Sequence, residues 1–421
     1  MIVHIYSLVS DLLLSFNAAM TTSILSPRAS SSRAAVTVCA AAMISLAVAM
    51  GVGRFAFTPL FPLMVRDGLL GSEAGAMIAA SNYLGYLVGA LVAARIRVKS
   101  ATLLALGLIS TVIVTAAVGW TSSVPIWGVL RFVAGVMSAW TLVATSAWGL
   151  GWLAALGRPH LAGAIFAGVG LGIAAAGLFC LVAAGPEVSS LGMWIELGGL
   201  AGIGTLFPLA VTRSLSAPAV IPGATAPQGA SHKPPANTVG LIVCYTLFGF
   251  GYILPATYLP ALARQLVDDP RVFGLAWPLF GVAAALSTIV VSWGLKRANR
   301  LSVWAASHLL MAIGVLLPSI WSSLASVSIA ALLVGGTFMV ITMIAMQEAR
   351  ARAEGNATVV LGRMTAGFAF GQLMGPVASA AIGRFAADFS TALNYALELS
   401  AAGLLLSAFY LWREVRRHDS H

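Results

Sequence analysis

The sequence has very few charged residues. Asp, Glu, Lys and Arg together make up 9% of the 421 residues, whereas hydrophobic residues make up 59%, and the mean hydropathy is +0.95. A water-soluble domain could not cover its surface with so few charges, which excludes a soluble enzyme or a soluble binding module. The composition predicts an all-α membrane protein that crosses the lipid bilayer many times.

Acidic residues are scarcer than basic ones, with 13 Asp and Glu against 23 Lys and Arg and a net charge of +10. In a soluble chain this excess would suggest a nucleic-acid partner. Here the cations lie in short loops between apolar runs, where orientation in the membrane explains them better. We therefore expect no nucleic acid as a partner.

Cysteines are few, and the common catalytic motifs are missing. Cys39, Cys180 and Cys244 all lie inside apolar runs without paired or metal-like spacing, so we expect no disulfide, no metal and no cofactor. The sequence has no nucleotide-binding Gly-x-x-x-x-Gly-Lys-Ser/Thr loop, no His-Glu-x-x-His and no Gly-x-Ser-x-Gly. These absences argue against an ATP-driven pump and against an intramembrane enzyme.

Twelve apolar stretches are long enough to cross a bilayer as helices. They are predicted at residues 35–65, 73–94, 101–120, 125–153, 161–184, 191–211, 238–261, 271–294, 301–319, 324–346, 361–383 and 392–411. Between the sixth and seventh stretches, a segment rich in Ala, Pro, Gly and Ser is predicted to be a linker. The predicted organisation is an N-terminal extension (1–34), a six-helix bundle (35–212), a cytoplasmic linker (213–236), a second six-helix bundle (237–412) and a cytoplasmic tail (413–421).

The N-terminal extension differs from the rest of the chain. Residues 1–19 are apolar, but they carry His4 and Asp11, lack a basic start and are short for a spanning helix. Residues 23–33 are rich in Ser and Arg and are predicted to be disordered. Two interpretations of the first segment stay open: translation begins at Met20, or the segment is a weak interfacial helix.

The loops on the two sides of the predicted membrane differ in charge. Loops after even-numbered spans and the C-terminal tail hold most of the cations, for example Arg350 and Arg417. The opposite loops hold most of the acids, for example Asp67 and Glu187. By the positive-inside rule, both termini are predicted to be cytoplasmic.

The first and seventh spans contain stretches with the same order of glycine and proline. At one constant offset, Gly51, Gly53 and Pro62 match Gly249, Gly251 and Pro260. Further pairs at nearly the same offset are Gly135 with Gly335, Gly163 with Gly362, Gly168 with Gly367, and Gly172 with Gly371. A six-helix unit that is repeated in the same orientation is typical of transporters with a pseudo-twofold axis along the membrane normal.

Glycine and proline allow a helix to bend or break. We therefore expect residues 51–62 and 249–260 to be irregular helices that face each other across the axis. The Gly-x-x-x-Gly ladder of the eleventh span predicts close helix approach. Gating or packing roles are predicted for Gly51, Gly53, Pro59, Pro62, Gly135, Gly249, Gly251, Pro255, Gly367, Gly371 and Gly375.

Arg54 is the one charge within residues 35–65. At a rise of ~1.5 Å per residue, its Cα lies ~16 Å below the polar edge at Arg66, near the middle of a ~30 Å hydrocarbon core. A charge at this depth is costly unless it faces water or a partner, so Arg54 is a candidate functional residue. The alternative is a structural arginine that binds the freed carbonyls of a broken helix.

Three motifs resemble those of the major facilitator superfamily. Residues 130–139, LRFVAGVMSA, place Arg131 four residues before Gly135. Residues 367–376, GFAFGQLMGP, are similar to a Gly-rich packing motif that contains proline. The loop after the second span keeps a glycine and the cations of the signature loop but lacks its Asp, which argues against the usual charge-relay gate.

A narrower resemblance comes from GVGRFAFTPLFPLM (51–64) and SNYLGYLVGA (81–90), which are similar to the YbfB/YjiJ branch of bacterial inner-membrane proteins. The resemblance implies two pseudo-twofold-related bundles of six helices, with spans one, four, seven and ten lining a central cavity. It also implies a secondary transporter of a small molecule that works by alternating access. We expect a monomer. A transporter-like sensor or scaffold that binds a ligand without moving it is the alternative.

The cavity positions that this fold implies give six candidates for substrate contact: Arg54, Phe57, Thr58, Arg131, Tyr252 and Gln372. For three of them another role stays open. Arg131 can snorkel to the periplasmic edge, Tyr252 can serve core packing, and Gln372 can bond one helix to another.

The charge balance of the expected cavity suggests the class of substrate. Two arginines without an acid at matching depth in the first half predict an anionic or carboxylate-bearing molecule, with Arg54 as its main contact. Glu348 is the one carboxylate that can compete for this role. Glu196, Glu398 and His308 are weaker candidates for proton coupling.

Overall fold

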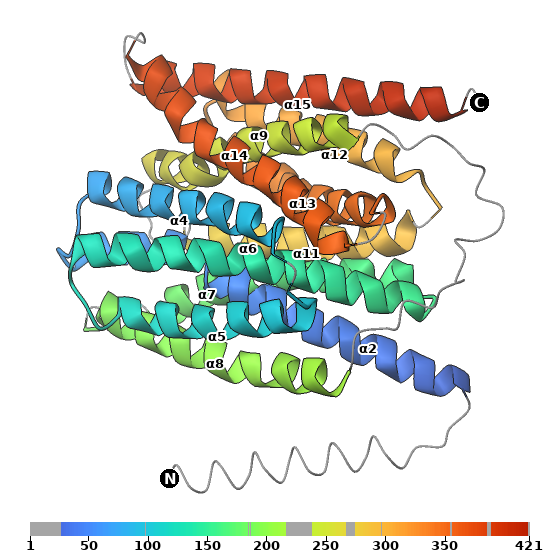
Figure 1. The fold of residues 1–421 in the computed structure, drawn as a ribbon. Helices are drawn as coiled ribbons and strands as arrows, with labels where there is room; N and C mark the ends of the chain where they lie inside the picture. The colour runs from blue at the N-terminus through green and yellow to red at the C-terminus, as the bar shows by residue number, and fades with distance from the viewer. Residues whose placement is uncertain are drawn as a thin grey trace, which may run out of the picture.

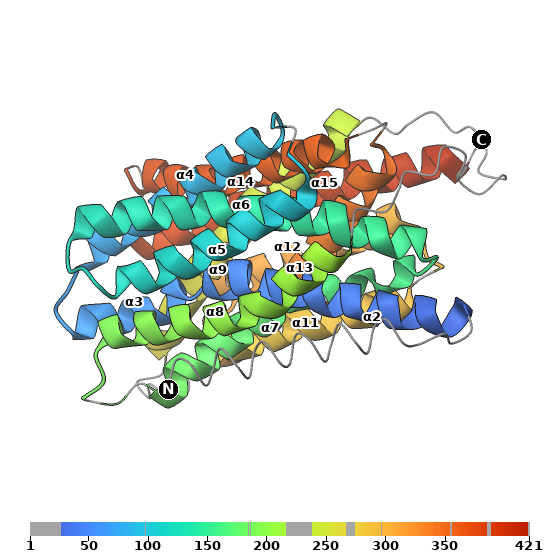
Figure 2. The same ribbon diagram turned by 60° about the horizontal axis from the view of Figure 1, so that its bottom comes forward.

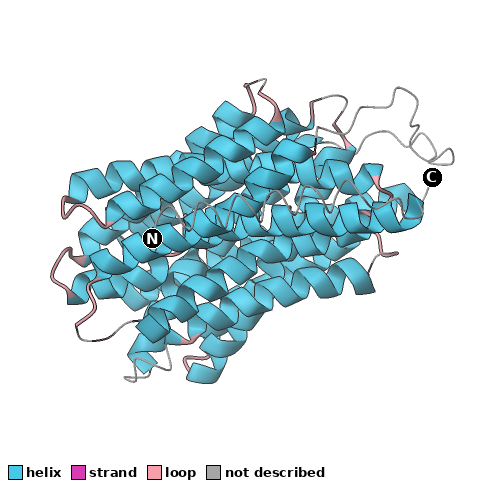
Figure 3. Cartoon of the chain, turned by 90° about the horizontal axis from the view of Figure 1, so that it is seen from below, coloured by secondary structure: helices cyan, strands magenta, loops and turns pink. Residues whose placement is uncertain are grey.

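The computed structural model describes residues 27–96, 98–183, 185, 187–215, 238–266, 274–295, 297–353, 356–384 and 389–419. Every regular element within these residues is a helix (Figure 3). The long helices lie side by side, with their axes roughly along one common direction (Figures 1 and 2). The start of α2 and the C-terminal end of α15 lie at the same end of the bundle (Figure 1).

The first bundle contains α2 (Pro27–Leu46), η1 (Ala47–Val52), α3 (Phe57–Arg66), α4 (Ser72–Ala93), α5 (Ser100–Val118), α6 (Val124–Ala155), η2 (Pro159–Leu161), α7 (Ala162–Ala183) and α8 (Ser190–Ser214). The second contains α9 (Thr238–Leu266), α11 (Ala276–Gly294), α12 (Arg300–Ile320), α13 (Leu324–Ala351), α14 (Ala357–Gly383) and α15 (Phe389–Asp419). The predictions for residues 1–26, and for most of the proposed linker, lie outside the described residues. The prediction of disorder is wrong for residues 27–33, which form the first turns of α2.

Eleven spans among the described residues are long and apolar enough to cross a membrane. The first, Ser31–Arg66, combines most of α2 with η1 and α3. The helix α14 is the twelfth span, with 27 residues, and is less apolar because it carries several glycines, Arg363 and Gln372. The prediction of twelve membrane-crossing helices is confirmed.

Glycine pairs bring equivalent helices into backbone contact in the two bundles. A Cβ atom at Gly51 would overlap the backbone of Gly172 on α7, so the first and fifth spans touch here. A Cβ atom at Gly249 would overlap the carbonyl of Phe368 on α14, and one at Gly371 would overlap that of Thr246 on α9. Small residues thus set the same close helix approach in both bundles, as the repeat predicts.

The break predicted in the first span is present. Ala47–Val52 is a π-helix, residues 53–56 form turns, and the α-helix resumes at Phe57. The matching prediction for the seventh span is wrong, because α9 is continuous from Thr238 to Leu266 through Gly249, Gly251 and Pro255. The two spans differ because, in the first one, Arg131 donates hydrogen bonds to the backbone carbonyls that the break leaves free.

Side-chain hydrogen bonds join the two bundles at the end where α6 ends and α7 begins. Arg350 Nη1 on α13 donates to the carbonyl of Ala147 on α6 at 3.0 Å. Ser292 Oγ on α11 donates to the carbonyl of His160 at 2.7 Å and accepts from the backbone N–H of Gly163 at 3.0 Å. These contacts hold the bundles together at this end.

Candidate functional site

Arg54 lies in the turn between η1 and α3, and only 3% of it is exposed. Its Cζ atom lies 3.7 Å from the ring centroid of Tyr86 on α4 and 5.3 Å from that of Phe55. The broken helix therefore places a guanidinium group over an aromatic face inside the protein, where cation–π attraction is strengthened by the loss of water.

The one hydrogen-bond acceptor that the structure gives the Arg54 side chain comes from the other bundle. Arg54 Nη2 donates to Oε1 of Gln372, which is fully buried on α14. Gln372 had been considered for a bond between helices or for substrate contact. Its amide oxygen in fact binds the arginine of the opposite bundle, so this pair bridges the two halves.

Several donors of this site make no hydrogen bond to a described residue. They are Nε and Nη1 of Arg54 and Nε2 of Gln372, and the hydroxyl of Tyr252 is likewise unpartnered. Burying a polar group without a partner costs about 1–3 kcal/mol, and more for a charged group. A site with buried, charged donors that lack hydrogen-bond partners is suited to a ligand that supplies acceptors.

No carboxylate among the described residues forms an ion pair with Arg54. The candidate competitor, Glu348, lies near the end of α13 and binds Arg300 at 3.3 Å and also Arg352. Within the part of the chain that the structure describes, no group of His, Cys, Asp and Glu residues could hold a metal ion. The positive charge of Arg54 is therefore not neutralised by a described carboxylate.

Arg131 is equally buried, at 3% exposure, but its side chain has a different role. Its Nη1 donates to the carbonyl of Gly53 at 2.6 Å and its Nη2 to that of Arg54. The alternative that Arg131 snorkels to the periplasmic edge is wrong, because the side chain is buried and bonded to backbone carbonyls. Its part in the cavity stays a prediction. It binds the carbonyls freed by the broken helix, the role that had been considered for Arg54.

This arginine also explains why α9 does not break. Counting from the matched pair Gly135 and Gly335, the position of Arg131 in the second bundle is occupied by Ala331. Alanine has no donor for freed carbonyls. In the second bundle the continuous helix keeps its own backbone hydrogen bonds, which avoids the cost of leaving buried carbonyls without a donor.

Phe57 and Thr58 do not join the Arg54 site. The ring of Phe57 lies 5.4 Å from Cζ of Arg131 and 5.7 Å from the ring of Phe61, inside an apolar cluster of the first bundle. Thr58 is half-buried on the first turn of α3. The prediction that both lie near Arg54 assumes helical spacing, which the turn at residues 53–56 interrupts.

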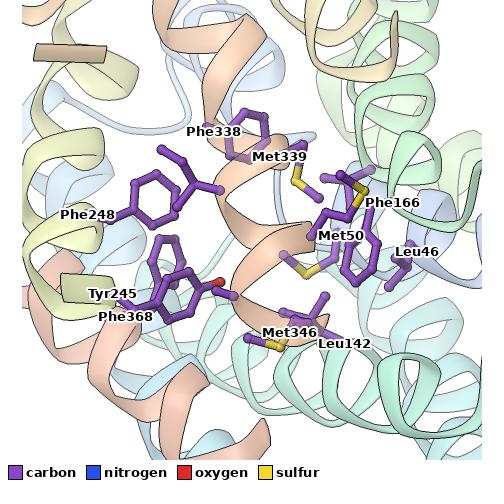
Figure 4. Close-up of a cluster of buried hydrophobic side chains, with 14 of the residues drawn as sticks. Leu46, Met50, Leu142, Phe166, Tyr245, Phe248, Phe338, Met339, Met346 and Phe368 are labelled. Atoms are coloured by element: carbon purple, nitrogen blue, oxygen red, sulfur yellow. The ribbon is translucent and has the colours of Figure 1, made fainter. Parts of the chain in front are cut away.

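Tyr252 is fully buried and stacks on Phe338 of α13, with ring centroids 5.0 Å apart. The rings of Phe248 and Phe368 also lie near it, with centroids at 5.9 and 6.2 Å. Tyr245, Phe248 and Phe368 lie together (Figure 4). Sequence reasoning missed these rings and Tyr86. A signal was present on α9, where Tyr245, Phe248 and Tyr252 follow at intervals of three and four residues, the spacing of one helix face.

The weaker candidates for proton coupling do not contact Arg54 or Gln372. His308 accepts a hydrogen bond from Trp304 at 3.0 Å, and its ring stacks on that of Phe248. Glu196 and Glu398 are exposed on α8 and α15.

Most of the predicted packing glycines abut a neighbouring helix. For each of these, a Cβ atom would meet the backbone or side chain of another element: Gly53 at Thr111, Gly135 at Asn82, Gly251 at Leu404, Gly367 at Thr246 and Gly375 at Ile253. Pro59 and Pro62 lie within α3, and Pro255 lies inside α9. The glycines thus act in close packing between helices, and their part in gating stays a prediction.

Two bundles of six helices are thus joined by a hydrogen bond between a buried arginine and a buried amide. A family model described as "Uncharacterised MFS-type transporter YbfB" matches residues 46–411, and the chain belongs to this family. It is thus a multi-span membrane protein that transports a small molecule.

Among solved structures, the chain resembles the crystal structure of the human organic anion transporter MFSD10 (TETRAN). The TM-score is 0.66 and the sequence identity 14%, and the match covers 92% of this chain and 100% of that one. At this identity the likeness shows the fold alone. No curated protein matches the chain.

Proposed function

We propose that this protein is a secondary transporter that carries a small organic anion across the bacterial inner membrane by alternating access. The anion binds to Arg54, with Gln372 as a second contact. One observation carries the proposal: Arg54 is buried between the two bundles with Nε and Nη1 unpartnered, and no described carboxylate pairs with it.

The chemistry of the guanidinium group supports an anion as the ligand. Arginine stays protonated even when buried, and its planar fork matches the two oxygens of a carboxylate. In surroundings of low polarity such a pair is much stronger than in water. The solved relative named above is an organic anion transporter, but the argument for this chain rests on Arg54.

The position of the site supports alternating access. Gln372 lies on α14 and Arg54 lies in the turn before α3, so a ligand that binds both residues contacts both bundles. A change in the relative position of the bundles then changes the access to the ligand. In the proposed orientation both termini are cytoplasmic, and the hydrogen bonds of Arg350 and Ser292 close the cytoplasmic end.

The proposal is tested by the melting temperature of the purified protein in a panel of anions and cations. We expect small carboxylates to raise the melting temperature. Arg54→Gln should abolish this shift while the protein stays folded, and Arg54→Lys should restore only part of it, because lysine keeps the charge but loses the fork. Stabilisation by cations and not by anions would contradict the proposal.

Uptake into liposomes separates a transporter from a sensor that only binds. Accumulation of a radiolabelled carboxylate that stabilises the protein, compared with liposomes that contain Arg54→Gln, measures movement directly. Binding without accumulation under every imposed ion gradient would favour the sensor.

A further inference from the structure

Aromatic side chains from both bundles surround Arg54. Its guanidinium group covers the ring of Tyr86 and lies beside Phe55. From the second bundle, Phe368 contacts the ring of Tyr86 with centroids 6.4 Å apart, and Tyr252 contacts Phe368 at 6.2 Å. The charged group therefore lies at the border of an aromatic region that continues into the second bundle.

Within the second bundle several rings of α9, α13 and α14 stack on one another. Phe338 and Tyr252 are 5.0 Å apart with an interplanar angle of 13°. Phe368 stacks on Phe248 at 5.0 Å and on Tyr245 at 5.1 Å, with angles of 30° and 26°. Together these five residues form what we call the aromatic wall, on α9, α13 and α14, and Figure 4 shows Tyr245, Phe248 and Phe368 close together.

Between the bundles the rings meet edge-on. The angle is 75° for Tyr86 with Phe368, 84° for Phe55 with Phe338 and 62° for Phe55 with Trp277. When the bundles move apart, these contacts break, whereas the stacked contacts inside the second bundle remain. The side of the wall that faced Tyr86 and Phe55 then lacks an aromatic partner, and a flat ligand ring can take that place.

The polar groups at the site restrict the ligand further. An amino acid would need a carboxylate for its ammonium group, and no described carboxylate pairs with Arg54. A sugar acid would bury several hydroxyls against rings, where they would lack partners. The Arg54 guanidinium group has two donor atoms without a partner among the described residues, which suits one carboxylate, and the neighbouring Arg131 is engaged with backbone carbonyls.

We propose that the substrate is an aromatic monocarboxylate. Its carboxylate binds Arg54, and its ring packs against the aromatic wall in place of the edge-on contacts of Tyr86 and Phe55. This inference rests on the proposed function, anion transport through Arg54, and specifies the rest of the ligand.

The test compares the binding of matched small molecules to the purified full-length protein, measured by melting temperature and by calorimetry. Benzoate is the probe. Cyclohexanecarboxylate keeps its charge and size but lacks the aromatic ring, acetate keeps only the carboxylate, benzamide keeps the ring without the charge, and phenylalanine adds an ammonium group. Benzoate should bind roughly 2- to 12-fold more tightly than cyclohexanecarboxylate, the range of a good aromatic contact.

Substitutions in the wall provide the second part of the test. Phe368→Leu should remove the preference for benzoate over cyclohexanecarboxylate and leave the binding of acetate unchanged. Phe338→Leu is the second variant, in case the first does not fold. Phe409→Leu is the matched control, because Phe409 lies on α15 and is 63% exposed. It should leave the preference unchanged.

The outcomes separate this inference from the proposed function. Equal affinity for benzoate and cyclohexanecarboxylate, or equal affinity for phenylalanine and benzoate, overturns the aromatic monocarboxylate and leaves anion transport standing. Failure of every anion to bind overturns the proposed function itself. Equal binding of benzamide and benzoate overturns the role of Arg54 as the charged anchor.

Discussion

Arg54 and Arg131 are the same residue type at the same burial, but their hydrogen bonds differ. Arg131 donates two hydrogen bonds to backbone carbonyls, and the backbone carbonyl of Arg131 accepts one from Asn82 Nδ2 at 2.9 Å. Among the described residues, the Arg54 side chain donates to Gln372 alone, and its Nε and Nη1 have no partner. Among the described residues, Arg131 leaves one buried donor, Nε, without a partner, whereas Arg54 leaves two. Arg131 should therefore act mainly in stability and Arg54 in binding.

This difference predicts opposite effects for the same substitution. Arg131→Gln should lower the free energy of unfolding by about 2 kcal/mol, because it removes charged hydrogen bonds to buried carbonyls. Arg54→Gln should leave the free energy of unfolding unchanged or raise it, because it removes buried donors that lack partners. Unfolding of the purified variants in a denaturing detergent measures both values. Equal destabilisation would mean that Arg54 is a structural residue.

At the scale of the helices, the backbone contact of η1 with α7 depends on glycine. Gly51→Ala should destabilise the protein, because the added Cβ atom meets the backbone of Gly172, which no side-chain rotation can move away. Gly199→Ala on α8 is the matched control, since a Cβ atom there meets nothing within 4 Å. The control should be neutral or stabilising by up to ~1 kcal/mol through helix propensity. Melting temperatures in detergent give the comparison, and equal values for the two variants would show that the contact is unimportant.

Hydropathy and repeat spacing predicted the helices and their glycine contacts because both are local or periodic properties of the chain. Glycine and proline predicted the break near Arg54, but the same pattern at Gly249, Gly251 and Pro255 leaves α9 continuous, so these residues permit a break without determining it. The donor for the freed carbonyls was not predictable, because Arg131 is 77 residues away from the carbonyl of Arg54. The bond from Arg54 to Gln372 spans 318 residues, and nothing in a single sequence marks such a partner.

At the scale of the whole molecule, the bundles are joined by hydrogen bonds at one end. Arg350 reaches from α13 to the carbonyl of Ala147, and a Cβ atom at Gly151 of α6 would meet its guanidinium at 3.0 Å. Ser292 of α11 binds both His160 and Gly163. The loop after the second span lacks the Asp of the superfamily's signature loop, so these contacts are candidates for holding this end closed in its place.

Loss of Arg350 should open this end toward the cytoplasm. Met346 lies one turn before Arg350 on α13 and is fully buried, so a cysteine introduced there is shielded while the bundles stay together. In a Met346→Cys background, Arg350→Ala should increase labelling by a membrane-impermeant maleimide several-fold in inside-out vesicles and leave it unchanged in intact cells. The native cysteines are all buried and give a low background. Arg413→Ala, an exposed arginine near the end of α15, is the control and should have no effect. Faster labelling only from outside the cell would contradict the proposed orientation. No change in labelling from either side would show that other contacts close this end.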